Sequence, residues 1–140
     1  GRGTIMTESV SIFVKMLIPQ RPLAVKEAQN VIIPALDGPY QVLPRRAPAM
    51  KLLRDGAVVL TGTDQGREET YFISSGIAKI RDNACTILTH NVIKSDEVDI
   101  GDVRKKLAVF RDKEEKGDVL DELESKKVAF LQMIAGHFAK

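Results

Sequence analysis

Up to Thr89 the sequence consists of short apolar runs separated by proline, glycine and other turn residues. The run from Val10 to Ile18 places an apolar residue at every second position, which predicts a strand with one buried face. Asp55-Gly56 predicts a hairpin, and polar turns separate the later runs. We count roughly eight to ten such strands, the last ending at Thr89, and no segment of helical period. Residues 6–93 are therefore expected to form an all-β sandwich, with a flattened barrel as the alternative.

Two turns are predicted within this segment, one from a pair of charged residues and one from two prolines. The pair Lys26-Glu27 is expected to separate two short strands. Pro44 and Pro48 each remove a backbone donor and fix φ, so the segment between them is expected to form a rigid, exposed turn. Arg45 and Arg46 lie side by side on this turn, which leaves two interpretations open: a contact point for a partner, or a solvated basic bend.

From Lys94 onward the pattern is helical. In residues 96–116 carboxylates gather at the beginning and basic residues at the end, which is the order that the dipole of a single helix favours. Asp99 is predicted to cap the first helix, Gly117 to end it, and Asp118 to cap the second helix. The first helix has a narrow apolar stripe of Val103, Leu107 and Phe110. The second has a wider apolar side, formed by Val119, Leu120, Leu123, Phe130, Leu131, Ile134, Ala135 and Phe138, with Lys127 among them.

Residues 94–140 are therefore expected to form a C-terminal helical hairpin. Because the first stripe is narrow, little apolar area would hold the hairpin in place, and a partner with a better surface could open it. A hairpin that permanently caps the sandwich is the alternative. At the other end of the chain, residues 1–5 precede a natural-looking start at Met6, and we expect them to be a cloning remnant outside the fold.

Composition excludes several classes of protein. The 21 basic and 19 acidic residues leave a net charge of +2, which gives no electrostatic case for binding nucleic acid or acidic lipid. A single cysteine, Cys85, excludes an internal disulfide and a cysteine-based zinc cluster, and we expect it to be a buried strand residue. No apolar run is long enough to span a bilayer, so membrane association would be indirect.

No credible catalytic or metal-binding group of residues is present in the sequence. His90 and His137 lie in different segments and lack the spacing of a metal-binding pair, so both are expected at the surface or at an edge. Ser75-Gly76 lacks the Gly-x-Ser-x-Gly pattern of a hydrolase nucleophile. The glycine-bounded segment 62–66 lacks the Lys-Ser/Thr ending of a phosphate-binding loop. We therefore expect neither catalytic residues nor a metal site.

Seven short motifs occur in a fixed order along the sandwich segment. They are Ile32-Ile33-Pro34, Asp37-Gly38, Val42-Leu43-Pro44, Ala47-Pro48, Asp55-Gly56, Ser74-Ser75-Gly76 and Thr86-Ile87-Leu88. In order and spacing they resemble the epsilon subunit of F-type ATP synthases, and the helical tail extends the resemblance to nearly the whole chain. The resemblance implies a non-catalytic rotor subunit that clamps the gamma subunit to the c ring. It also implies a peripheral position at the cytoplasmic face of a bacterial inner membrane.

The resemblance further implies which residues contact partners. Exposed loops would provide the contacts with the gamma subunit and the c ring, through Asp37, Gly38, Tyr40, Arg45 and Arg46. The resemblance also implies that the C-terminal helices regulate ATP hydrolysis by inhibiting it. In this chain a basic first helix would face acidic segments of the catalytic alpha and beta subunits, through Arg104, Lys105, Lys106, Arg111 and Lys113.

The chain departs from the nucleotide-binding pattern of the family. Some epsilon subunits bind ATP through the sequence Ile-Asp-x-x-Arg-Ala at a helix start. Here Ile100 and Arg104 remain, but Gly101 and Lys105 replace the aspartate and the alanine. Neither ATP nor another cofactor is therefore expected. Two other functions stay open: a sensor in which a nucleotide locks the hairpin down, and a β-sandwich adaptor unrelated to the synthase.

Overall fold

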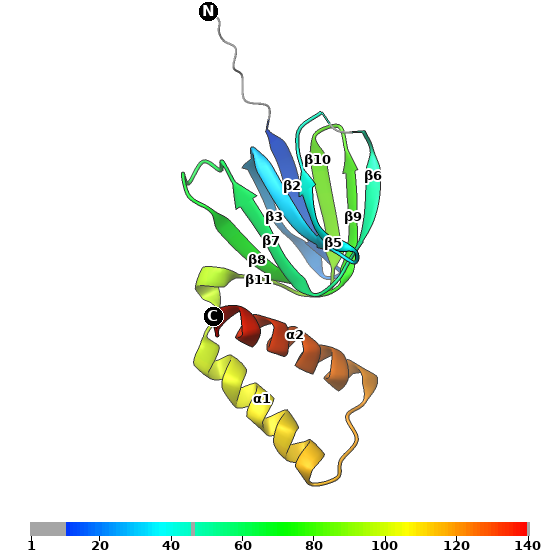
Figure 1. The fold of residues 1–140 in the computed structure, drawn as a ribbon, viewed down its shortest axis with the longest axis vertical. Helices are drawn as coiled ribbons and strands as arrows, with labels where there is room; N and C mark the ends of the chain where they lie inside the picture. The colour runs from blue at the N-terminus through cyan, green and yellow to red at the C-terminus, as the bar shows by residue number, and fades with distance from the viewer. Residues whose placement is uncertain (1–10, 46, 140) are drawn as a thin grey trace, which may run out of the picture.

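The computed structural model describes residues 11–45 and 47–139, with a β-sandwich at one end and two helices at the other (Figure 1). Residues 1–5, Val10 and Arg46, for which predictions were made above, lie outside the described residues. The strands are β2 (Ile12–Ile18), β3 (Arg21–Ala28), β4 (Asn30–Ala35), β5 (Gly38–Val42), β6 (Ala49–Leu53), β7 (Gly56–Thr61), β8 (Glu69–Ile73), β9 (Gly76–Arg81), β10 (Ala84–Thr89) and β11 (Val92–Lys94).

The ten strands belong to one continuous sheet in the order β11-β8-β7-β4-β6-β9-β10-β2-β3, with β5 paired to β4. All pairings are antiparallel except that of β10 with β2. β4 and β6 share a single residue pair, Ala35 with Leu53, and the sheet folds over at this place. The fold brings β6, β9, β10 and β2 opposite β4, β7 and β8, which confirms the predicted sandwich (Figure 1).

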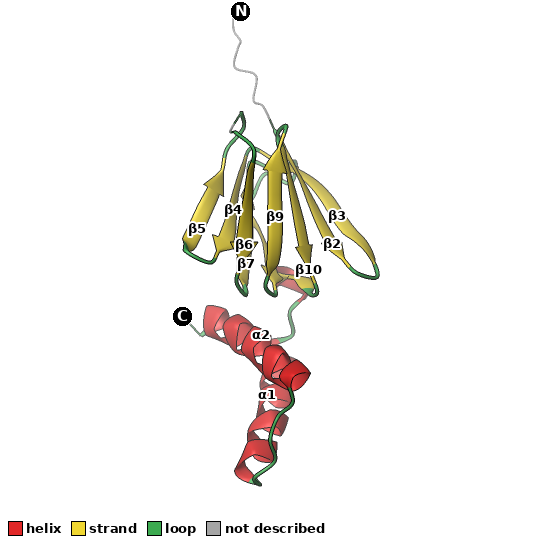
Figure 2. Cartoon of the chain, turned by 90° about the vertical axis from the view of Figure 1, so that its right-hand side faces the viewer, coloured by secondary structure: helices red, strands yellow, loops and turns green. Residues whose placement is uncertain are grey.

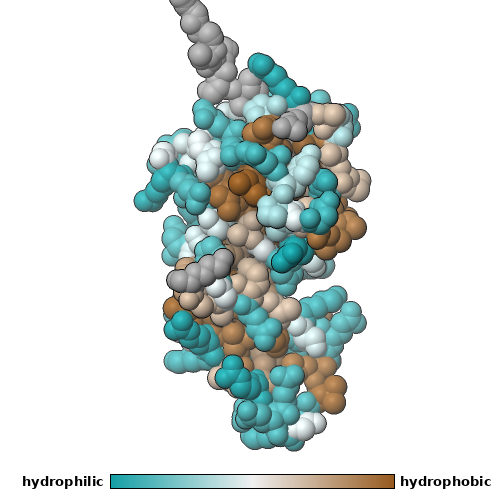
Figure 3. Space-filling view, viewed as in Figure 1, coloured by the Kyte–Doolittle hydropathy of each residue, from teal (hydrophilic) through white to brown (hydrophobic). Residues whose placement is uncertain are grey.

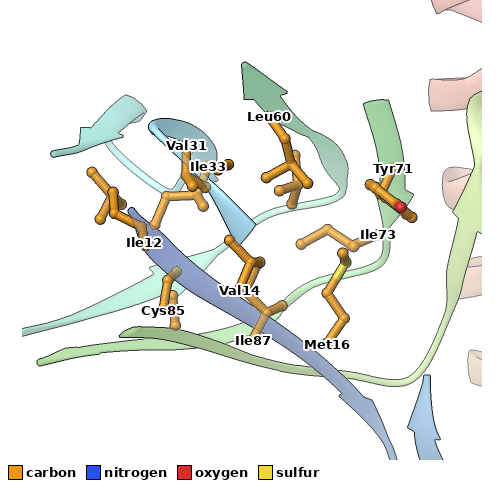
Figure 4. Packing of buried hydrophobic residues seen from close by; sticks show 14 of the residues in the cluster. Ile12, Val14, Met16, Val31, Ile33, Leu60, Tyr71, Ile73, Cys85 and Ile87 are labelled. Atoms are coloured by element: carbon orange, nitrogen blue, oxygen red, sulfur yellow. The ribbon is translucent and has the colours of Figure 1, made fainter. Parts of the chain in front are cut away.

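The core lies between the two layers and follows the predicted period of two. Ile12, Val14 and Met16 of β2 are fully buried, whereas Phe13 and Lys15 between them face outward. Figure 4 shows these side chains meeting those of the opposite layer, such as Leu60. Cys85 is buried in the same cluster, as expected, and burial raises the pKa of its thiol to about 12.

Two sequence expectations about the sheet are wrong. Lys26 and Glu27 do not form a turn but lie within β3, paired with Val14 and Phe13 of β2. Lys26 can stay in the strand because its ammonium group lies 3.6 Å from the buried carboxylate of Glu69. The sheet also continues beyond Thr89, since β11 pairs with β8. A strand of three residues is too short to be recognised by periodicity, and its pairing with β8 decides its conformation.

The C-terminal segment begins with a 3₁₀ turn, η1 (Ser95–Glu97), followed by α1 (Ile100–Glu115) and α2 (Glu122–Phe138). Asp99 caps α1 as predicted, because its Oδ1 accepts a hydrogen bond of 3.1 Å from the backbone of Asp102. The prediction for α2 is wrong: its cap is Asp121, not Asp118. Asp121 forms a capping box with Glu124, and the preceding residues stay in a loop. Among the described residues, no helix is long and apolar enough to cross a membrane.

The two helices pack on each other and on the lower end of the sandwich (Figure 2). Val103 of the predicted stripe is buried with Leu131 and Ile134 of α2, and Leu107 and Phe110 pack against this cluster. The sandwich contributes the fully buried Phe72. Val119 and Leu123 were expected on the apolar side of the second helix, but they are 92% and 78% exposed. Both lie at or before the start of α2, where neither α1 nor the sandwich covers the chain.

Candidate partner interface

The predicted contact residues of the loops lie at two opposite ends of the sandwich. Asp37 lies in the turn between β4 and β5, and Gly38 begins β5, at the end of the sandwich that faces the helices. Arg45 follows β5 at its other end, so the whole length of that strand separates Arg45 from Asp37. The structure therefore does not bring these residues together into one surface.

Tyr40 lies between these two ends, within β5, and its side chain already has contacts. The ring packs against the sandwich core, and Lys51 Nζ lies 4.4 Å from the ring centroid. This cation–π contact occupies one face of the ring. Tyr40 is therefore half-buried, whereas Asp37 and Arg45 are exposed.

Arg45 adopts an uncommon backbone conformation. Its φ is +65°, in the left-handed region that non-glycine residues rarely occupy. Asn83, in the turn between β9 and β10, accepts a hydrogen bond of 2.7 Å from the Arg45 backbone N–H through Oδ1. This contact joins residues 38 positions apart in the chain and fixes the turn that holds Arg45.

An exposed apolar band crosses the outer face of four strands, and the sequence analysis did not predict it. The pairing register places Leu52, Ile77, Leu88 and Leu17 side by side on β6, β9, β10 and β2. Leu52 is 56% exposed and Leu88 is 38% exposed. The sequence signal was present, because an outward apolar residue next to an inward one breaks the polar–apolar alternation, as in Ile87-Leu88. We call these four residues the apolar band.

The apolar band lies against a recess of about 680 Å³ near the helix-facing end of the sandwich. Leu36, from the turn between β4 and β5, extends its apolar wall, and His90 and Lys126 provide polar groups. Figure 3 shows hydrophobic surface at this end of the sandwich, on the side where β6 lies in Figure 1. Exposed apolar area that is concave and rimmed by polar groups is typical of a protein-binding surface.

The predicted basic residues of the tail all lie on α1, and their surroundings differ. Lys106 pairs with Asp102 at 3.1 Å, and Lys113 pairs with Glu124 of α2. Arg104, Lys105 and Arg111 are exposed and make no ion pair within the described part of the chain. Only these three cations are therefore free to bind an acidic partner without first breaking a contact.

The remnant of the nucleotide motif is divided between two environments. Ile100 packs against the helical cluster, whereas Arg104 lies on the exposed side of α1. Gly101 is exposed between them and has no side chain to orient a ribose or a base. Within residues 11–45 and 47–139, no group of three or more histidine, cysteine or acidic residues could hold a metal ion.

The β-sandwich domain of the ATP synthase delta/epsilon chain is the family whose model matches this sequence, over residues 11–95. This chain belongs to that family. The ATP synthase epsilon chain of Maricaulis maris is 31% identical, and the alignment covers 87% of this chain and 94% of that protein. The epsilon chain of Mesorhizobium japonicum is 30% identical over 86% of this chain and 87% of its own length. The predicted family is thereby confirmed.

Two solved structures share the fold. A chain of the mitochondrial ATP synthase of Euglena gracilis, in an F1/c-ring structure, aligns with a TM-score of 0.69 at 21% identity and covers 99% of this chain and 85% of its own. A chain of the central stalk and c ring of Tetrahymena thermophila aligns with a TM-score of 0.59 at 15% identity, over 94% of this chain and 98% of its own.

Proposed function

We propose that this chain is a non-catalytic subunit of the central stalk of an F-type ATP synthase, where it joins the gamma subunit to the c ring. The complex would lie at the cytoplasmic face of a bacterial inner membrane, and the chain would reach the membrane only through its partners. Membership of the delta/epsilon family supports this role. The structural observation that supports this role is the apolar band, which has the exposed apolar area typical of a protein-binding surface.

The apolar band is suited to a stable contact that transmits force. Covering a half-exposed leucine contributes on the order of 1 kcal/mol, so four neighbouring aliphatic side chains provide a substantial part of a protein interface. The band lies on four hydrogen-bonded strands and not on a loop, and its backbone therefore moves little when a partner pulls on it. We assign the apolar band to the gamma subunit.

The test is a double substitution, Leu52→Asp with Leu88→Asp, because it places two charges in the band without touching the core. We expect binding to the gamma subunit, measured by calorimetry, to weaken at least tenfold, while the circular dichroism spectrum stays that of the wild type. Leu123→Asp is the control, since Leu123 is more exposed than either leucine and lies on α2, away from the band. Wild-type affinity of the double variant would remove the band from the interface.

We further propose that the tail regulates ATP hydrolysis through Arg104, Lys105 and Arg111. These three exposed cations support the proposal, because they can bind acidic segments of the catalytic subunits. Replacing all three by glutamine should relieve inhibition of hydrolysis in the reassembled catalytic sector. The relief should resemble the effect of high salt, which screens exposed charges over roughly 10 Å at 0.1 M. Lys116→Gln, which removes a cation already paired with Asp112, is the control. Equal hydrolysis by all variants would contradict this role.

We infer that ATP is not a ligand of this chain. Gly101 stands where the nucleotide-binding members have a carboxylate, and Lys105 stands where they have a small residue. Titration calorimetry with millimolar ATP tests the inference, and a measurable heat of binding would favour a nucleotide sensor instead.

A further inference from the structure

Cations occupy the outer face of the β6-β9-β10-β2 layer above the apolar band. In the next row of the register, Thr86 of β10 lies between Lys79 of β9 and Lys15 of β2. Arg81 lies one row further along β9. All three basic side chains are exposed. The outer face of this layer therefore has an apolar half near the helices and a cationic half toward the end where Arg45 lies. In the cationic half the exposed Met50 and Phe13 lie beside the basic residues.

Acidic residues are missing from this face of the four strands, although the exposed Glu27 lies on the neighbouring strand β3, opposite Phe13. The described outward positions of these four strands are Phe13, Lys15, Leu17, Met50, Leu52, Ile77, Lys79, Arg81, Ala84, Thr86 and Leu88, and none is Asp or Glu. The chain as a whole has almost as many acidic as basic residues, 19 against 21. The excess of basic over acidic residues on the outer face of these four strands is therefore a local property of the sheet and not a consequence of composition.

The cations of this face are free to bind a partner. Lys15, Lys79 and Arg45 make no ion pair within residues 11–45 and 47–139. Arg81 pairs with Asp82 at 3.4 Å, but both side chains are more than three-quarters exposed. An ion pair so exposed is weak, and Arg81 can exchange Asp82 for a carboxylate of a partner protein.

Asn83 joins the turn that holds Arg45 to the end of this layer. Asn83 and Asp82 both have positive φ and form the tight turn that joins β9 to β10. The backbone carbonyl of Asn83 accepts a hydrogen bond of 2.9 Å from the N–H of Phe13 at the beginning of β2. Its side chain accepts the 2.7 Å bond from Arg45. Asn83 thus joins β2, the β9–β10 turn and the turn that holds Arg45.

We propose that Lys15, Lys79, Arg81 and Arg45 form a carboxylate-binding half of the gamma-docking face, and that Asn83 is the positioning residue that fixes Arg45 within it. The partner surface that fits has an apolar strip with carboxylates about 7 Å away, the distance of two residues along a strand. The apolar band provides affinity, while the cations speed association and set the orientation of the partner. The identity of the partner rests on the proposed function.

The first arm of the test measures the association of the chain with the gamma subunit at several salt concentrations. We expect Lys15→Gln with Lys79→Gln to lower the association rate constant about tenfold at low salt, and the difference to vanish near 1 M salt. Lys127→Gln, which removes an exposed cation of α2, should leave the rate unchanged. An unchanged rate in the double variant would overturn the cationic half of the proposal.

The second arm compares Asn83→Gly with the wild type. Glycine tolerates positive φ, so the variant keeps the turn, but it has no acceptor for the Arg45 N–H and adds no charge to the cationic half. We expect Asn83→Gly to bind the gamma subunit about three- to tenfold more weakly than the wild type, with both proteins melting within a few degrees of each other. Equal affinities of the two proteins would overturn the positioning role.

The outcomes separate this proposal from the proposed function. Failure of the wild-type chain to bind the gamma subunit overturns the proposed function. Binding that Leu52→Asp with Leu88→Asp abolishes, but that the charge and Asn83 variants leave unchanged, supports the proposed function and overturns the present inference. A charge effect seen with the c ring and not with the gamma subunit also overturns it.

Discussion

Glu69 is a carboxylate buried where three strands meet. It lies on β8, and its Oε1 is 3.6 Å from Lys26 Nζ on β3 and 3.7 Å from Lys94 Nζ on β11. The hydroxyl of Tyr71 donates a hydrogen bond of 3.1 Å to the same oxygen. Burial alone would raise the pKa of Glu69, but the neighbouring hydroxyls of Thr63 and Tyr71 and the two lysines lower it below its ordinary value. The ionised carboxylate therefore stabilises the fold.

The pKa of Glu69 is lower in the folded chain than in the unfolded one. The stabilisation is therefore present above the ordinary glutamate value of 4.5 and is lost as the pH falls through the folded value. We expect Glu69→Gln to lower the free energy of unfolding in urea at neutral pH by about 1–3 kcal/mol. The difference from the wild type should shrink as the pH falls below about 4.5. Glu68→Gln, at the exposed neighbouring position, is the control, and a difference that does not change with pH would contradict the assignment.

At the scale of elements, the beginning of α2 depends on one short network. Glu124 closes the capping box by accepting a hydrogen bond from the backbone N–H of Asp121, and its other oxygen pairs with Lys113 of α1 at 2.5 Å. The hydrogen bond from Lys113 and that from the Asp121 backbone lower the pKa of Glu124. One side chain thus begins α2 and joins it to the end of α1.

The two candidate caps provide a matched pair of substitutions. We expect Asp121→Ala to destabilise the chain by about 1 kcal/mol, because it leaves the backbone N–H of Glu124 without its acceptor. Asp118→Ala should change stability by less than about 0.5 kcal/mol, since no side-chain cap forms at that position. Urea denaturation followed by helical circular dichroism measures both. A larger effect at Asp118 would show that α2 begins earlier in solution.

At the scale of the whole molecule, the helices are attached to the sandwich by a small contact area. Among the residues that the structure describes, Phe72 is the one fully buried residue that the sandwich contributes to the helical cluster. Its ring lies 4.8 Å from that of His137 and 5.8 Å from that of Phe138. His137 is exposed, as expected, in spite of this contact. Beside Phe72, a recess of about 660 Å³ separates α2 from the outer face of β4 and β7. Removal of the helices would therefore uncover Phe72 but leave the sandwich core intact.

Deletion of residues 96–140 should leave a folded sandwich, because β11 ends at Lys94 and the core cluster contains no helical residue. We expect the truncated chain to keep its β-type circular dichroism spectrum but to bind the hydrophobic dye ANS several-fold more than the full chain. Phe72→Ser in the truncated chain should reduce that dye binding at least twofold. Loss of the β spectrum on truncation would show instead that the helices are required for the sandwich to fold.

Much of the architecture was predictable because it follows from interactions between neighbours in the sequence. Alternation in Val10 to Ile18 predicted the buried face of β2, and the charge order of residues 96–116 predicted the first helix, with Asp99 as its cap. The two prolines around Arg45 predicted its exposed turn. Each of these features depends on backbone geometry and side-chain chemistry within a few residues. The local sequence was therefore sufficient to determine them.

Contacts between distant residues were decided only by the tertiary structure. Lys26 stays in a strand because Glu69 lies across from it, and Arg45 keeps a left-handed backbone conformation because Asn83 accepts its N–H. The apolar band exists because the register aligns Leu17, Leu52 and their neighbours, from four separate strands, on one face. Which strands become neighbours, and in which register, depends on how the whole core packs. For that reason no single stretch of the chain specifies its surface.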